Sequence, residues 1–278
     1  MILIHFLTIA VDKANFTDVE HTRWDGVLGL KPSSSSGADL FAEVLKKQNL
    51  TDVAAFGVYF SSHFTGSKVT FGGIDPKRVP HFDNLTFNKL YDENSWSVGI
   101  RSMRYGDVEI GGQATSGVVD TGSYMLMLPT DDYNRWLTAI KDNKTCGTYS
   151  KYQGCFCEGV VNDEMFDPIY VTLDYYEYRI VPDEYIKRVD SEGKKFCYFL
   201  VGEIKDSGAT IAALGDTFIR NYYVYYDMEN KRIGLYGDYM VHHEPVMSSP
   251  NPTSSKDHNV SIKMGVIASI LIVCVLLC

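Results

Sequence analysis

Hydrophobic and polar positions alternate along much of the chain, in short runs bounded by Gly, Asp and Asn. Period-two alternation is typical of β-strands, whose successive side chains point to opposite faces of a sheet. Two early runs, 56–60 and 68–71, predict a hairpin that ends at Gly72 and Gly73. Further strands rich in aromatic and β-branched residues are predicted at 96–100, 108–110, 169–173 and 178–181. The pattern therefore predicts a protein dominated by β-structure.

Helical periodicity is found in two short stretches. Asp39 can cap the first helix and Thr130 can cap the second, because both side chains accept hydrogen bonds from free backbone N–H groups. The apolar faces consist of Leu40, Phe41, Val44 and Leu45 in the first helix and of Tyr133, Trp136, Leu137 and Ile140 in the second. We expect the first helix to serve packing rather than chemistry.

Composition places the chain among globular proteins. Its 278 residues are 45% hydrophobic, enough to bury a core in one large domain or two smaller ones. The 26 basic and 35 acidic residues give a net charge of −9 without a basic block, so a nucleic-acid partner is not expected. Most of the 19 tyrosines alternate with apolar residues in strands such as 222–226, which favours a packing role.

Four of the six cysteines, at positions 146, 155, 157 and 197, fall in one β-rich region, whereas Cys274 and Cys278 lie in an apolar tail. Four cysteines allow three disulfide pairings. Cys155 and Cys157 are too close to bridge each other comfortably, which leaves two pairings open. No histidine lies between positions 157 and 197 and the seven histidines are scattered, so no metal site is predicted.

Five glycosylation sequons support the same oxidising compartment as the clustered cysteines. Their asparagines are Asn15, Asn49, Asn84, Asn143 and Asn259. Residues 1–11 have neither a basic n-region nor a clear cleavage site, so this segment is not predicted to be a signal peptide. Residues 6–9 instead resemble a strand. We expect the secretory pathway.

The C-terminal region changes composition twice. Residues 241–263 form a polar linker rich in Pro, Ser and Asn, and residues 264–278 are fifteen nearly unbroken apolar residues. Fifteen residues are short for a membrane span, which needs roughly twenty. Small residues, a polar spacer and a terminal apolar tail are the layout of a GPI-attachment signal. We predict anchoring at the cell surface or an endolysosomal or vacuolar membrane, by a GPI anchor in preference to a transmembrane helix.

The strongest chemical signal is Val118-Val119-Asp120-Thr121-Gly122-Ser123. The two valines suit a strand, and Gly122 allows a sharp turn that presents the carboxyl group of Asp120. Residues 212–216, Ala-Ala-Leu-Gly-Asp, form an apolar run whose glycine can lie close beneath another backbone. A second run of this type at 25–30 follows no acid-bearing segment. Taken alone, Asp120 could equally cap a turn.

Asp206-Ser207-Gly208 imitates the acid-bearing signature but follows Lys205 rather than an apolar strand. We therefore predict that it is the loop entering the next strand.

Taken in order, these segments resemble the pepsin-like aspartic peptidases over roughly residues 1–238. The resemblance is carried by the segments 25–30, 71–75 (Phe-Gly-Gly-Ile-Asp), 96–98, 118–123, 214–220 (Leu-Gly-Asp-Thr-Phe-Ile-Arg), 225–227 and 233–235. In that family two similar lobes each contribute one Asp-Thr-Gly loop beside an apolar-apolar-Gly strand. The resemblance implies an all-β, bilobal fold with few short helices, containing the later part of the first lobe and a complete second lobe.

The domains implied are 1–76 for the first lobe and 77–240 for the second, followed by the linker and the tail. Val27-Leu28-Gly29 would be the partner strand of a first acid loop upstream of Met1. The family also implies disulfides between Cys157 and Cys197 and between Cys146 and Cys155.

The resemblance assigns roles to the loop residues. Asp120 is one of two catalytic acids, Thr121 braces the loops, Gly122 makes the turn and Ser123 hydrogen-bonds the carboxylate. Val118, Tyr124 and Ala213 match positions along the substrate groove, although Tyr124 replaces a small hydroxyl residue. No cofactor and no metal are needed, because two carboxylates can act as base and acid toward a water molecule.

The function implied is that of an aspartic endopeptidase acting on peptide or protein substrates, a monomer when complete. Because only Asp120 has the right context, this chain alone is predicted to be inactive. One alternative is a relative that binds peptides without cutting them. A retroviral-type homodimer is disfavoured, since a self-pairing lobe has no use for the strand at 27–29.

Overall fold

The structure of the chain is a computed structural model that describes residues 28–32, 41–61, 65–149, 152–158, 161, 164–191, 194–206, 208–237 and 239–241. The strand predicted at 6–9, the linker from residue 242 onward and the apolar tail lie outside these residues. Every structural statement below concerns the described part of the chain.

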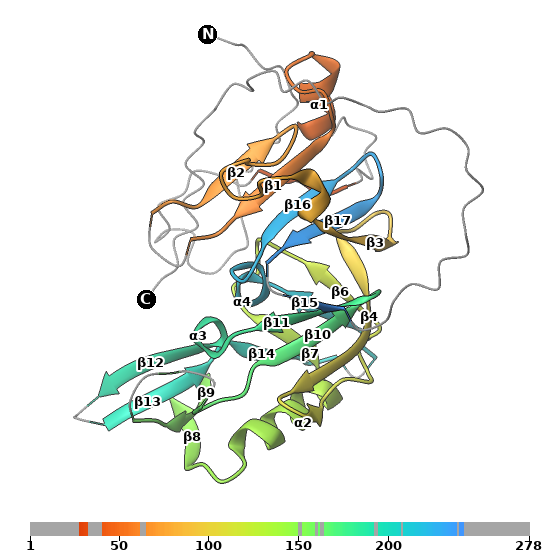
Figure 1. The fold of residues 1–278 in the computed structure, drawn as a ribbon. Helices are drawn as coiled ribbons and strands as arrows, with labels where there is room; N and C mark the ends of the chain where they lie inside the picture. Colours follow the sequence, from red (N-terminus) through yellow and green to blue (C-terminus); the bar gives the residue numbers. More distant parts are fainter. Residues whose placement is uncertain are drawn as a thin grey trace, which may run out of the picture.

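Strands dominate the fold and form two sheets (Figure 1). The larger sheet has 14 strands, ten of which follow the order β14-β7-β15-β6-β4-β3-β17-β16-β1-β2. These ten are β1 (Ala55–Tyr59), β2 (Lys68–Phe71), β3 (Thr86–Asp92), β4 (Ser97–Tyr105), β6 (Ser116–Val119), β7 (Leu126–Pro129), β14 (Val201–Ile204), β15 (Ile211–Leu214), β16 (Tyr223–Asp227) and β17 (Arg232–Tyr236). The others are β5 (Val108–Glu109), β10 (Ile169–Leu173), β11 (Tyr176–Ile180) and β18 (Tyr239–Val241). The predicted β-rich, pepsin-like fold class is confirmed.

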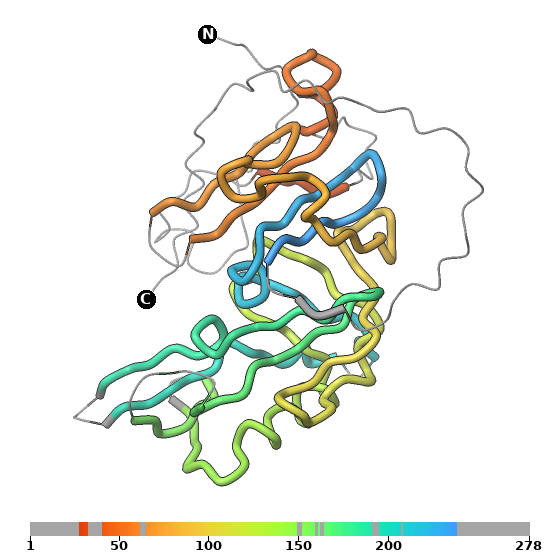
Figure 2. The backbone as a smooth tube through the Cα atoms, viewed as in Figure 1, coloured from red at the N-terminus to blue at the C-terminus, as the bar shows by residue number. Residues whose placement is uncertain are grey.

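The early hairpin and a late strand share one sheet. β1 pairs with β2 and also antiparallel with β16, with Val58 opposite Val224. Figure 2 shows these segments, far apart in the sequence, running side by side. The ring of Phe56 stacks on Tyr226 at 4.6 Å between centroids and meets Trp96 edge-on at 5.8 Å. The part assigned to the first lobe is thus joined to the second by backbone hydrogen bonds and aromatic packing.

The helices are short. They are α1 (Phe41–Lys47), α2 (Thr130–Lys141), α3 (Pro182–Tyr185), α4 (Asp216–Ile219) and a 3₁₀ turn, η2 (Phe82–Asn84). In α2 the side chains of Trp136 and Ile140 are fully buried, as its apolar face predicts. The prediction that Thr130 caps α2 is wrong. Pro129 is the N-cap, and the Thr130 hydroxyl donates instead to Glu203 Oε1 at 3.0 Å, because β14 lies beside this end of the helix.

The smaller sheet has four strands in the order β12-β13-β9-β8. They are β8 (Cys146–Tyr149), β9 (Tyr152–Phe156), β12 (Ile186–Ser191) and β13 (Lys194–Phe199). One disulfide, Cys146–Cys155, joins β8 to β9, and the other, Cys157–Cys197, joins the residue after β9 to β13. These are the pairs that the family resemblance implies. They cross-link a sheet too small to bury a core of its own.

Three of the sequon asparagines, Asn49, Asn84 and Asn143, are exposed, so each could accept a glycan. Asn15 and Asn259 lie outside the described residues. Within the described ranges, no helix has both the length and the apolar character needed to cross a membrane.

Candidate active site

The acid-bearing loop joins β6 to β7, and β15 passes between these two strands. β15 runs parallel to β6, with Val118 opposite Ala213, and antiparallel to β7. The loop therefore crosses over the C-terminal end of β15. Asp120 N donates to the carbonyl oxygen of Leu214 at 3.2 Å, and Asp216 N donates to that of Ser123 at 2.7 Å. These two hydrogen bonds attach both sides of the loop to the strand beneath it.

Gly215 makes this crossing possible. A Cβ atom at this position would overlap the carbonyl oxygens of Ser123 and Met125. Only glycine lets the two backbones approach so closely. At Gly29, in the similar run of the first lobe, no described atom lies within 4 Å of the corresponding Cβ position.

The carboxyl group of Asp120 is half-buried and receives hydrogen bonds on both oxygens. Gly122 N donates to Oδ1 and the Ser123 hydroxyl donates to Oδ2, each at 2.9 Å. Two donors hold the carboxyl group in one orientation. The predicted contact from Ser123 is therefore present. Thr121 is half-buried, and its bracing role stays a prediction.

A second carboxyl group, that of Asp216 at the start of α4, lies beneath the loop. It is 7% exposed, and Arg220 Nη2 lies 3.6 Å from its Oδ2. Burial raises the pKa of Asp216 from 3.8 to about 6, Arg220 opposes this rise and the charge of Asp120 adds to it.

Aromatic residues support the loop from behind. The hydroxyl of Tyr226 donates to the carbonyl oxygen of Val119 at 3.3 Å, and its ring is fully buried. Burial raises the pKa of Tyr226 far above its ordinary value, and the charges of Asp120 and Asp216 raise it further, so the hydroxyl stays protonated. On the other side, the indole N–H of Trp96 donates to the carbonyl oxygen of Leu30 at 2.6 Å, which joins the first-lobe segment to this region.

Of the predicted groove residues, Val118 and Ala213 are half-buried neighbours on β6 and β15, and Tyr124 is 39% exposed just beyond the loop. The positions of Asp216 and Tyr226 at this site were not predicted. Asp216 appeared only as part of a family motif and Tyr226 only as one of many packing tyrosines. A carboxyl group directly after the apolar-apolar-Gly run was the available signal for Asp216.

Asp206 lies on an exposed turn between β14 and β15, where its Oδ1 accepts a hydrogen bond from Gly208 N at 3.0 Å. The prediction that this segment is the loop entering β15 is confirmed.

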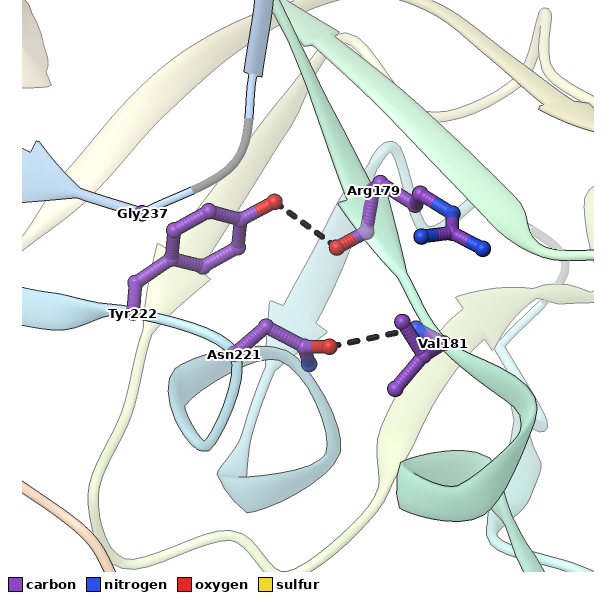
Figure 3. Close-up of a pocket in the computed structure, with 5 residues that line it drawn as sticks. All are labelled: Arg179, Val181, Asn221, Tyr222 and Gly237. Atoms are coloured by element: carbon purple, nitrogen blue, oxygen red, sulfur yellow. Dashed lines mark hydrogen bonds between the residues drawn. The ribbon is translucent and has the colours of Figure 1, made fainter.

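A separate pocket of about 260 Å³ lies between β11 and the segment joining α4 to β16, lined by Arg179, Val181, Asn221, Tyr222 and Gly237 (Figure 3). Two of its polar side chains form hydrogen bonds with backbone groups. The hydroxyl of Tyr222 donates to the Arg179 carbonyl at 2.7 Å, and Asn221 Oδ1 accepts from Val181 N at 3.1 Å. None of the predicted site residues lines it. Across the described residues, no group of three or more His, Cys, Asp or Glu side chains could hold a metal ion.

Comparison with known proteins decides the family. The sequence profile of the eukaryotic aspartyl proteases matches residues 3–236. The chain belongs to the eukaryotic aspartyl protease family. The Asp120 loop, the apolar-apolar-Gly strand at 213–215 and the joined sheet all lie within the matched region.

Similar proteins include gastricsin of Rattus norvegicus, 28% identical over 79% of this chain and 55% of the relative. Cathepsin E of Mus musculus is 29% identical over 77% of this chain and 54% of the relative. Vacuolar protease A of Neurospora crassa is 25% identical over 77% of this chain and 52% of the relative. The chain thus spans about half the length of these aspartyl protease relatives.

Proposed function

We propose that this chain is part of an aspartic-type endopeptidase and that Asp120 is one of its two catalytic carboxyl groups. The observation that carries the proposal is the Asp120 loop, held over β15 with a hydrogen-bond donor on each carboxyl oxygen. A carboxyl group that only caps a turn does not require a second strand and a glycine beneath it. Membership of the family supports the same assignment.

The chemistry requires two carboxyl groups that share one proton. One takes a proton from a water molecule while the other protonates the carbonyl oxygen of the peptide, and no covalent intermediate is needed. Gly122 N–H and the Ser123 hydroxyl hold the Asp120 carboxyl group in one orientation for its share of this work. The half-buried Val118 and Ala213 flank the reacting peptide in the proposed complex, and Thr121 braces the loop.

The Asp-Thr-Gly motif occurs once in the 278 residues. We therefore propose that the second carboxyl group comes from a segment outside this sequence and that the 278-residue chain alone does not cleave peptides. The same observation favours one second candidate function, a relative that binds peptides without hydrolysing them. Asp216 is not the second acid, because it lies beneath the loop in contact with Arg220.

The test supplies the absent acid and then removes Asp120. The chain is fused to the first-lobe segment of a pepsin-like relative that carries an Asp-Thr-Gly loop, and cleavage of a fluorogenic peptide is measured from pH 3 to pH 7. We expect hydrolysis with an acidic optimum, inhibition by a statine peptide, and a loss of about 10²–10⁴-fold or more in Asp120→Asn, since Asn keeps the shape but cannot take the proton.

Asp206→Asn, on the exposed turn, is the matched control and should retain full activity. Activity that survives in Asp120→Asn, or cleavage by the unextended chain as a monomer, would show that Asp120 is not half of a catalytic pair. A correctly folded fusion that binds statine peptides but never hydrolyses substrate would favour the peptide-binding alternative.

We also propose that the protein follows the secretory pathway. Two disulfides and three exposed sequon asparagines suit an oxidising compartment. One relative is named vacuolar protease A, which places that protein in the vacuole. Attachment to a membrane through residues 264–278, with a GPI anchor preferred to a transmembrane helix, stays a prediction from the sequence.

A further inference from the structure

Three tyrosines from separate segments meet beside the Asp120 loop. Tyr124 is the residue directly after the loop motif, Tyr152 is on β9 and Tyr198 is on β13. The hydroxyl oxygens of Tyr124 and Tyr152 lie 3.2 Å apart, within hydrogen-bond distance. The rings of Tyr152 and Tyr198 lie 4.9 Å apart and are tilted by 31°. We call these three residues the tyrosine cluster.

The register of the smaller sheet puts more aromatic rings on the same face. Tyr198 is opposite Gly154 and Phe196 is opposite Phe156, so Tyr152, Phe156, Phe196 and Tyr198 share one side of β9 and β13. Phe156 and Phe196 pack edge to face at 5.6 Å. Gly154 lies between the two pairs and has no side chain on this face. A Cβ atom there would overlap the Phe196 ring and the Cys197 carbonyl oxygen.

This aromatic face is open at both ends. Tyr124 is 39% exposed next to the loop, and Phe156 is 50% exposed at the far end of β9. The disulfides Cys146–Cys155 and Cys157–Cys197 hold β8, β9 and β13 together, so the rings lie on a cross-linked support. Rigid, half-buried aromatic side chains give large contact area at low entropic cost.

We propose that the tyrosine cluster is a specificity-determining subsite that takes an aromatic or large apolar side chain of an extended peptide, away from the bond to be cleaved. The inference deepens the proposed function and rests on it for the placement of that bond at Asp120. Continuity identifies the occupant: Tyr124 follows Ser123 directly, so a peptide lying across the loop reaches the cluster next.

The chemistry of the cluster favours aromatic and aliphatic side chains of a peptide over charged ones. The hydroxyl groups of Tyr124 and Tyr152 bond to each other, so the ring surfaces are what the cluster offers to a ligand. Burial raises the pKa of Tyr124 to about 12, and the bond to Tyr152 adds to this rise, so the hydroxyl of Tyr124 stays protonated at acid and neutral pH. An aromatic side chain gains both apolar burial and ring–ring contact there.

The test measures binding to the full chain, so it does not depend on hydrolysis. The probes are fluorescein-labelled eight-residue peptides with a central statine and serine elsewhere, in which one phenylalanine is moved through each other position. Fluorescence anisotropy gives the dissociation constant of each peptide and of the all-serine host. We expect one position at which phenylalanine tightens binding.

That phenylalanine gain should fall about three- to tenfold in Tyr124→Ser, Tyr152→Ser and Tyr198→Ser, the value expected for one aromatic contact. Tyr152→Phe, which keeps the ring, should retain the gain, as should the control Tyr91→Ser, a 63% exposed tyrosine on β3. Affinity for the all-serine host should be unchanged in Tyr152→Phe and Tyr91→Ser, and the far-ultraviolet circular dichroism spectrum of each serine variant should match that of the wild type, which separates loss of the subsite from misfolding.

The inference is overturned if no position shows a phenylalanine gain, or if the gain persists in all three serine variants. Failure of the proposed function has a different signature: the fusion that supplies a second Asp-Thr-Gly loop would not hydrolyse peptides, while the tyrosine-dependent phenylalanine gain remained in the full chain. If instead the fusion hydrolyses peptides and the gain is independent of the cluster, the proposed function stands and the subsite does not exist.

Discussion

At the scale of single residues, the site contains two carboxyl groups in contrasting surroundings. Asp120 is half-buried and accepts two hydrogen bonds, one on each carboxyl oxygen. Asp216 is buried beneath the same loop, with one oxygen, Oδ1, that accepts no hydrogen bond within the described structure. Arg220 partly offsets the cost of its charge and also lies 3.4 Å from the Ser61 carbonyl oxygen. The Asp216–Arg220 ion pair therefore connects the buried carboxyl group beneath the loop to Ser61, which follows β1.

The raised pKa of Asp216, about 6 instead of 3.8, predicts a pH dependence of stability. Between about pH 4 and pH 6 the folded chain keeps a proton that the unfolded chain releases, so the stability that this group contributes is present below pH 4 and lost as pH rises through 6. The full change is about 3 kcal/mol. Asp216→Asn should remove most of this fall in the free energy of unfolding, measured by urea denaturation from pH 4 to pH 7.

Asp206→Asn, on the exposed turn, serves as the control and should keep the wild-type slope. An Asp216→Asn variant whose stability falls as steeply as that of the wild type would show that another group carries the dependence.

At the scale of elements, the loop and β15 form one unit that depends on Gly215. β6, β15 and β7 lie side by side, and the loop that joins β6 to β7 must cross over β15 to keep this order. The hydroxyl of Thr217 in α4 donates to the Tyr124 carbonyl oxygen at 3.1 Å, so the exit of the loop is also attached to the helix. Position 120 is thus set by two further segments of the chain.

Gly215→Ala tests this unit. The added methyl group would overlap the carbonyl oxygens of Ser123 and Met125, which are backbone atoms and cannot rotate away. We expect a loss of about 1–3 kcal/mol or more in the free energy of unfolding, seen as a lower urea midpoint. Gly147→Ala on β8, where the new atom meets open space, should change the midpoint little. Equal midpoints for the two variants would contradict the close crossing.

At the scale of the whole molecule, the early β1–β2 hairpin and the late strands β16 and β17 share one sheet. β1 is hydrogen-bonded to β16 over five residue pairs, and Tyr223 of β16 accepts a hydrogen bond from the backbone N–H of Asp75 at 2.9 Å. The stacked rings of Phe56 and Tyr226 continue this contact toward Val119. Displacement of the β1–β2 hairpin would therefore also disturb Tyr226, whose hydroxyl supports the Asp120 loop through Val119.

Gly57→Ala should test the coupling, because a Cβ on Gly57 would overlap the ring and hydroxyl of Tyr223. We expect faster amide hydrogen exchange in β1, β2 and β16 together, with β9 and β13 unaffected, as measured by mass spectrometry. Gly73→Ala, with open space around the new atom, is the control. Faster exchange confined to β1 would mean that the hairpin and β16 open independently.

Much of this architecture can be predicted from local sequence patterns. Short runs of apolar, aromatic and β-branched residues bounded by turn residues were enough to predict β1, β2, β4 and β10, because such residues suit a buried or half-buried strand. The order of the family motifs was enough to indicate the fold class and to single out Asp120. The cap of α2 was mispredicted because the Thr130 hydroxyl found Glu203, a partner 73 positions away that no local pattern reveals.

Only the tertiary structure decided what lies around the loop. Strand periodicity can assign each tyrosine to one face of its own strand, but it does not show which tyrosines lie near the site. Tyr226, Tyr152 and Tyr198 were found there only in the folded structure. Likewise, the sequence by itself determined that an acid follows Gly215, whereas its raised pKa depends on burial beneath a loop 93 to 96 positions earlier in the chain. Burial, strand register and the distance between charged groups depend on segments that are distant in sequence, so they are defined only once the chain has folded.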